Sequence, residues 1–153
     1  MLKVSDNIVH FLERQGFVIV STIDSTEFSH TSCKGMLKVE GDRVYLVDLY
    51  WSDTYQNLKK NPLMSITAVD KDQYIGYCLK GRGKIVKKEE ISPTLLKEWQ
   101  NKKAGRTTSR IIKNIRAEKR NDVHPEASFP EPQHLIIMEV EEIVDLTRYD
   151  KKG

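Results

Sequence analysis

Two hydroxyl side chains stand where a short helix should begin, in the stretch DLYWSDTYQNLKKNP that spans residues 48–62. Ser52 and Thr54 lie at the first turn of a helix predicted over residues 54–60. The first N–H groups of a helix have no partner within it, and with nearby hydroxyls they form a good site for an anion. The stretch therefore has the groups to hold a ligand that carries a phosphate.

The same residues also fit an ordinary connection between two strands. The stretch lies between the apolar runs RVYLV and LMSITAV, which are typical of strands. Ser52 or Asp53 is a good N-cap, and Asn61 followed by Pro62 ends a helix. The residue pattern alone leaves both interpretations open, a capped connector and a phosphate site.

The histidines and cysteines form no catalytic or metal-binding motif. The histidines have none of the spacings of a zinc site, and the cysteines form no CxxC pair. We therefore expect no metal, and we expect Cys33 to be a small packing residue. The histidines are residues 10, 30, 124 and 134, and the cysteines are residues 33 and 78.

Positive charge is concentrated in one segment. Residues 102–120 contain eight lysines and arginines and one acid, Glu118, for a net charge of +7, while the whole chain carries +3. A basic helical stripe over residues 106–120 could neutralise the phosphates of a nucleic acid. No aromatic side chains alternate with these charges, which favours a solvated face or a contact with an acidic partner and leaves nucleic-acid binding as an alternative.

The composition is that of one globular domain. Of the 153 residues, 39% are hydrophobic and 31% are charged, so the chain can bury a core under a charged surface. No apolar run approaches the roughly 20 residues that span a bilayer, and the first residues lack the pattern of a signal peptide. Two distant cysteines are typical of reduced thiols. We expect a single domain over residues 1–153, in the cytoplasm and not in a membrane.

Hydrophobic periodicity and turn signals predict six strands and four helical segments. Strands joined by short turns pair antiparallel, and six strands in a small domain remove their exposed edges by closing into a barrel. The predicted fold class is mainly β, a six-stranded antiparallel barrel with peripheral helices and a basic helical insertion at about residues 92–121. The predicted strands are residues 17–23, a hairpin over 28–49, 63–70, 73–88 and 134–146, and the helices are residues 5–15, 54–60, 92–103 and 107–120.

Alternation along the first strand of the 28–49 hairpin divides its side chains between two faces. One set is mostly polar and consists of His30, Ser32, Lys34, Met36 and Lys38. The other set is small or apolar, and we expect it to point inward; it consists of Thr31, Cys33, Gly35, Leu37 and Val39.

The predicted short helix and its surroundings resemble the pyridoxamine 5′-phosphate oxidase-like family of flavin-binding split barrels. The run LMSI matches the strand that follows the family's short helix, and SHTSCKG, with Lys34 in the matching position, occupies the place of its flavin-contacting strand. The likeness extends over about residues 7–90. Five residues match the family's helix pattern, K-T-x-x-N-L-x-x-N-P: Thr54, Asn57, Leu58, Asn61 and Pro62.

The resemblance implies a split barrel that forms a homodimer and binds FMN. It further implies a flavin-dependent oxidoreductase that acts on a small-molecule substrate or electron donor, with a non-catalytic flavin carrier as the alternative. In such a protein the cofactor carries the redox chemistry. Lys34 would then supply a positive charge to a phosphate at the helix start. The implied flavin-binding residues are His30, Thr31, Ser32, Lys34, Asp48, Ser52 and Thr54.

The sequence departs from the family's pattern at flavin-binding positions. Asp53 and Thr54 stand where the oxidases carry an arginine and a lysine, Ser29 stands where they carry a phosphate-binding arginine, and Gly76 replaces a flavin-contacting glutamine. The carboxylate of Asp53 opposes an anion at the same helix end, because both compete for the same field.

Overall fold

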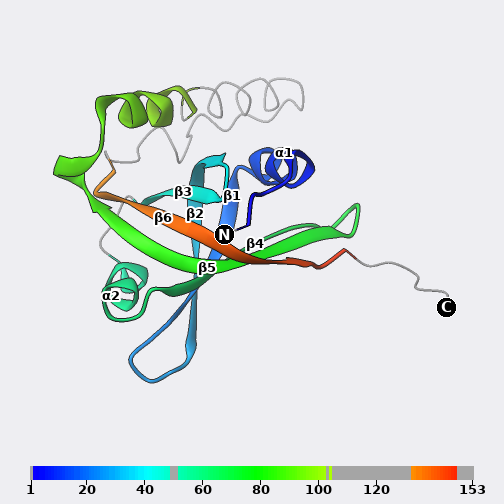
Figure 1. Ribbon diagram of the computed structural model, residues 1–153, viewed down its shortest axis with the longest axis horizontal. Helices are drawn as coiled ribbons and strands as arrows, with labels where there is room; N and C mark the ends of the chain where they lie inside the picture. Colours follow the sequence, from blue (N-terminus) through cyan, green and yellow to red (C-terminus); the bar gives the residue numbers. More distant parts are fainter. Residues whose placement is uncertain (1, 49–51, 103, 105–131, 148–153) are drawn as a thin grey trace, which may run out of the picture.

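Six strands form a closed antiparallel barrel in the order β1-β2-β3-β6-β5-β4, in a computed structural model that describes residues 2–48, 52–102, 104 and 132–147 (Figure 1). The predicted fold class is confirmed. The strands are β1 (Phe17–Ile23), β2 (Ser29–Glu40), β3 (Arg43–Asp48), β4 (Leu63–Asp70), β5 (Ile75–Lys87) and β6 (His134–Asp145). The helices are α1 (Asp6–Gln15), α2 (Asp53–Lys60), the short 3-10 helix η1 (Lys88–Glu90) and a helix that begins at residue 93.

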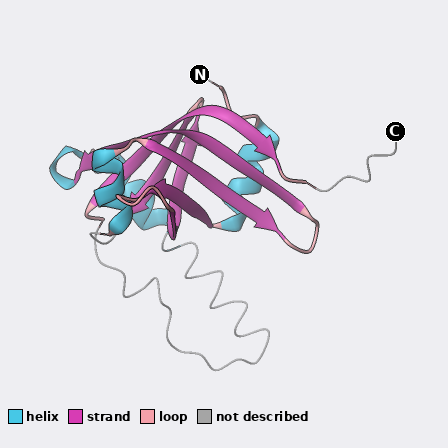
Figure 2. Cartoon of the chain, turned by 90° about the horizontal axis from the view of Figure 1, so that it is seen from below, coloured by secondary structure: helices cyan, strands magenta, loops and turns pink. Residues whose placement is uncertain are grey.

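The barrel closes through pairings between strands that no short turn connects. Strands that follow one another through short turns pair as hairpins, as in β1–β2, β2–β3 and β4–β5. Strand β4 pairs with β1, and β6 lies between β3 and β5 and pairs with both. Figure 2 shows the strands wrapping round one another with the helices outside them. Every strand thus has two hydrogen-bonded neighbours, which leaves no free sheet edge among the six.

The two labelled α-helices lie on opposite sides of the long strands β5 and β6 (Figure 1). Helix α1 buries Phe11 and Leu12 in the barrel core, and α2 buries Leu58 in the same core. Burial of each such side chain contributes about 1.5–3 kcal/mol. This packing fixes α2 against the barrel, and with it the residues at the helix start.

A second apolar cluster lies on the outer face of the barrel, under the helix that begins at residue 93. The Ser92 hydroxyl caps that helix, since it accepts a hydrogen bond from the Leu95 N–H at 3.2 Å. Lys102, at the start of the basic segment, donates to the carbonyl of Leu37. The cluster consists of Leu37, Val47, Ile91, Trp99 and Leu135.

Several predictions fall on residues outside those that the structure describes. They include the helix over residues 107–120, with most of the basic segment, and the last residue of the hairpin predicted over residues 28–49. No helix among the described residues is both long enough and apolar enough to cross a membrane.

The inward face predicted for β2 is wrong over its first half. Lys34 pairs with Val18, whose side chain lies in the core, and directly paired residues share one face of a sheet. His30, Ser32, Lys34 and Met36 of the polar set therefore face the barrel interior, and Lys38, beyond Met36, does not. Thr31 and Cys33, which we expected to point inward, are exposed on the outer face.

A bulge in β2 explains why alternation fails there. The β2–β3 register runs through Met36 and resumes at Lys38, so Leu37 is an extra residue without a partner in β3. Met36 belongs to the barrel core, whereas Leu37 belongs to the outer cluster and Val39 packs against the core again. A single bulge thus shifts the alternation by one residue along the strand.

Candidate functional site

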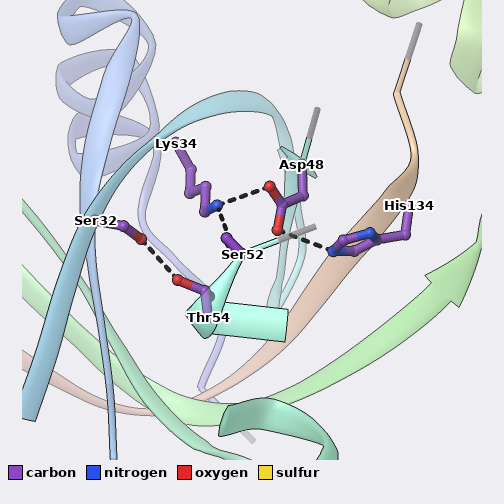
Figure 3. A network of polar contacts seen from close by, with 6 residues as sticks. All are labelled: Ser32, Lys34, Asp48, Ser52, Thr54 and His134. Atoms are coloured by element: carbon purple, nitrogen blue, oxygen red, sulfur yellow. Dashed lines mark hydrogen bonds and ion pairs between the residues drawn. The ribbon is translucent and has the colours of Figure 1, made fainter. Parts of the chain in front are cut away.

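Polar side chains that face the barrel interior meet at the end of the barrel next to α2 (Figure 3). Lys34 lies within β2, Asp48 is the last residue of β3 and His134 is the first residue of β6. Asp48 and His134 are direct partners in the β3–β6 register. Each of the three has the same strand parity as buried core residues of its own strand, and this parity directs all three inward.

Lys34, Asp48 and His134 form a buried ion-pair network. Lys34 Nζ lies 2.7 Å from Asp48 Oδ1, and His134 Nε2 lies 2.9 Å from Asp48 Oδ2. The side chains of Lys34, Asp48 and His134 are 9%, 2% and 0% exposed. Both oxygens of the carboxylate thus meet a nitrogen, as a buried charge requires.

The pKa of Asp48 lies below its ordinary value of 3.8. Burial alone would raise this pKa, because it removes water from the charged form. The hydrogen bonds from His134 and Lys34, together with the charge of Lys34, outweigh burial and lower the pKa. Asp48 is therefore a carboxylate at neutral pH, and it neutralises the charge of Lys34.

Hydroxyl groups tie the start of α2 to β2. Lys34 Nζ donates to Ser52 Oγ at 3.2 Å, and the hydroxyls of Ser32 and Thr54 lie 2.8 Å apart (Figure 3). Thr54 is fully buried. Ser52 occupies the N-cap position, yet within the described part of the chain its side chain makes no capping hydrogen bond. The hydroxyls expected at a phosphate are thus engaged with β2.

The remainder of α2 holds the helix in place. Asn57 Nδ2 donates to Thr22 Oγ1 at 3.1 Å, and both residues are buried. At the other end, the Asn61 N–H donates to the carbonyl of Asn57 at 2.8 Å, and Asn61 Oδ1 accepts from the Leu63 N–H at 3.0 Å. The helix ends before Asn61, as predicted.

The charges around the helix start do not favour an anion. Lys34 contributes one positive charge, while Asp48 and the exposed Asp53 in the first turn of α2 contribute two negative charges. His134 carries a charge only if it is protonated. The sum over these described residues is therefore −1 or zero, and residues 49–51 between the two acids are uncharged in the sequence.

Most of the residues predicted for the site converge. His30 is half-buried on the same face of β2, opposite Thr22, and Thr31 lies exposed on the outer face. The sequence interpretation missed His134. The alternation of side chains along the predicted strand could have identified it, because His134 lies two residues before Ile136 and so shares its inward face. The converging residues are Ser32, Lys34, Asp48, Ser52 and Thr54.

Two hollows on the described surface lie away from this network. One has a volume of about 360 Å³ on the barrel wall and is lined by residues that include Ile23, Leu63 and Lys80. The other, of about 300 Å³, is lined by residues that include Arg82 and Lys84. Among residues 2–48, 52–102, 104 and 132–147, no three His, Cys, Asp or Glu side chains come together to hold a metal ion.

Comparison with known protein families decides where this barrel belongs. A family model described as pyridoxamine 5′-phosphate oxidase matches residues 4–144, which is most of the chain and reaches all six strands. The chain belongs to the pyridoxamine 5′-phosphate oxidase family. The family resemblance expected from the sequence is thereby confirmed, and no curated protein matches the chain.

Solved structures of this oxidase family and its relatives share the fold at low sequence identity. HupZ of Group A Streptococcus is 16% identical, with a TM-score of 0.66, and the match covers 98% of this chain and 100% of HupZ. A Clostridium acetobutylicum protein of the pyridoxinephosphate oxidase family, related to general stress protein 26, is 14% identical (TM-score 0.55; 94% and 96% covered). An F420 reductase is 15% identical (TM-score 0.59; 92% and 98% covered).

Members of the pyridoxamine 5′-phosphate oxidase family often bind a flavin. In this chain the groups at the helix start do not fit the doubly charged phosphate of FMN. The amine of Lys34 is buried and paired with Asp48, and the hydroxyl of the buried Thr54 bonds to Ser32. Asp53 adds a carboxylate where an anion would bind.

Proposed function

We propose that the chain is a flavin-binding protein and an oxidoreductase that acts on a small-molecule substrate or electron donor. The observation that carries this proposal is the family match over residues 4–144, which includes every element that meets at the start of α2. FMN is the flavin that the resemblance of the sequence to this family implies. When bound, a flavin supplies the redox chemistry, and the protein binds and orients it.

The flavin is proposed to bind where β2, the end of β3 and the start of α2 meet. His30 and Ser52 are only partly buried there, so each leaves part of its surface open to a ligand. The ion-pair network of Lys34, Asp48 and His134 joins β2, β3 and β6, and the hydrogen bond from Lys34 to Ser52 joins the network to the start of α2. In this arrangement the buried residues position the site, and the partly exposed ones contact the ligand.

Flavin titration of the purified full-length chain tests the proposal. We expect flavin fluorescence to be quenched on binding, and we expect His30→Ala to weaken binding about threefold to tenfold, as loss of one ligand contact would. Anaerobic bleaching of the bound flavin by a nicotinamide cofactor would separate an oxidoreductase from a carrier. If no flavin binds at concentrations up to the millimolar range, the proposal is wrong.

A homodimer is part of this proposal, and an exposed apolar strip supports it. Phe17 and Ile19 on β1 and Leu63 and Val69 on β4 are 37–56% exposed. The β1–β4 register places all four on the same outer face, beside the hollow of about 360 Å³. Apolar side chains of this size at the centre of a surface are typical of the contact between two subunits.

Ile19→Lys should weaken dimerisation at least about tenfold, because it places a charge in the middle of a buried apolar contact. Sedimentation velocity at micromolar concentrations measures this effect. Leu2→Lys is the matched control, since Leu2 is 44% exposed but lies against β6, where its N–H donates to the carbonyl of Val140. A wild-type chain that sediments as a monomer, or equal behaviour of the two variants, would contradict the proposed interface.

A further inference from the structure

We infer that the site at the start of α2 selects a flavin without a terminal phosphate, of the riboflavin class, over FMN. This inference rests on the proposed flavin-binding function and specifies its ligand. Its basis is the charge and engagement of the groups that a phosphate would have to meet, described above.

Among the described residues, the cation at the helix start is Lys34, and its amine is not available to an external anion. Lys34 Nζ lies 2.7 Å from Asp48 Oδ1 and 3.2 Å from Ser52 Oγ, and its side chain is 9% exposed. Asp48 stays ionised at neutral pH because its pKa is lowered by the hydrogen bonds that outweigh its burial. A phosphate that bound Lys34 would have to break this pair and would leave the carboxylate of Asp48 beside it.

The start of α2 does not compensate a phosphate for the cost of breaking the Lys34–Asp48 pair. A phosphate monoester carries a charge of about −1.5 to −2 at pH 7. The dipole of α2 favours an anion at this end, but the carboxylate of Asp53 occupies the first turn and already satisfies that preference. A ribityl chain that ends in a hydroxyl avoids the repulsion, and it can both donate a hydrogen bond to a carboxylate and accept one from Ser52.

The substitution Asp53→Asn tests the repulsion between the carboxylate of Asp53 and the phosphate of FMN. Asp53 is exposed and makes no ion pair within the described residues, so the substitution leaves the buried network intact. We expect it to tighten FMN binding about threefold to tenfold, from the repulsion of a double charge in water at moderate salt, and to change riboflavin binding by less than about twofold. Asp72→Asn is the matched control, because it removes the same charge in the turn at the far end of β4.

The experiment titrates riboflavin and FMN into the wild-type chain and both variants at one salt concentration. The expected wild-type result is riboflavin binding that is tighter than FMN binding. FMN binding that is as tight as riboflavin binding, or tighter, would overturn the inference alone, and it would mean that cations from elsewhere, such as the basic segment, meet the phosphate. Absence of binding by both flavins would overturn the proposed function and the inference together. Unchanged FMN binding in Asp53→Asn would also overturn the inference.

Discussion

Asp48→Ala should destabilise the protein by about 3–5 kcal/mol, because it leaves the buried Lys34 ammonium without a counter-charge. The side chain of Lys34 has too little exposure to reach water without a change in the barrel end, and His134 loses its acceptor as well. The measurement is urea unfolding at pH 7, followed by fluorescence. Such a loss is a large part of the 5–15 kcal/mol that is typical of a domain.

The double variant Lys34→Met/Asp48→Ala is the control for this explanation. Removing both charges should recover most of the lost stability, since an apolar side chain in place of a buried ion is often neutral. If the double variant is less stable than Asp48→Ala, the charge of Lys34 is not the cause.

The dependence of stability on acidic pH is an independent test of the Lys34–Asp48 pair. The pKa of Asp48 in the folded chain is lower than its ordinary value of 3.8, which applies when the chain is unfolded. The stabilisation is therefore complete above the unfolded pKa and is lost as the pH falls through the folded one. The free energy of unfolding of the wild type should drop below about pH 4, and this drop should be smaller in Asp48→Ala.

Gly81→Ala should destabilise the protein by about 3 kcal/mol or more, at the upper end of the range for overpacking. A Cβ atom at Gly81 would overlap the carbonyl oxygen of Glu139 on β6. This atom belongs to the backbone, and the β5–β6 register shifts between Lys80 and Gly81, so relief requires the two strands to separate at their irregular point. The measurement is again urea unfolding.

Gly83→Ala is the matched control on the same strand. There the added Cβ would meet Sδ of Met64, which is the end of a flexible side chain. Rotation of Met64 can relieve that contact, so the expected loss is about 1 kcal/mol. Equal losses for the two glycines would show that the backbone overlap at Gly81 is absorbed elsewhere.

The order of strands and helices could be predicted from the sequence because turns and apolar runs are local signals. Helix α1, the hairpin of β2 and β3, and the end of α2 at Asn61 follow the predicted bounds closely. The inward face of β2 could not be predicted from alternation, because the bulge at Leu37 depends on pairing with β3. The apolar side chain of Leu37 packs in the outer cluster and not in the barrel interior.

The site was predictable in part for the same reason. The hydroxyls of Ser52 and Thr54 are recognisable beside a predicted helix start, but their partners come from a different strand. The pairing of Asp48 with His134 joins residues far apart in the sequence and depends on β6 lying next to β3. Only the closed barrel order supplies that neighbour, whereas Lys34 and Asp48 lie on the two strands of one hairpin, β2 and β3.

The position of β6 has a consequence for the growing polypeptide during synthesis. Strands β3 and β5 are both made before β6, and each keeps an unpaired edge until residues 134–145 have left the ribosome. At about 5–20 residues per second, the chain between Asp48 and His134 takes roughly 5 to 20 seconds to make. Throughout that interval the nascent chain carries the open edge of β3 and a buried-type carboxylate that lacks its histidine, and the edge of β5 is added once residue 87 has been made. This is the stage at which the polypeptide is most exposed to aggregation and has most need of a chaperone.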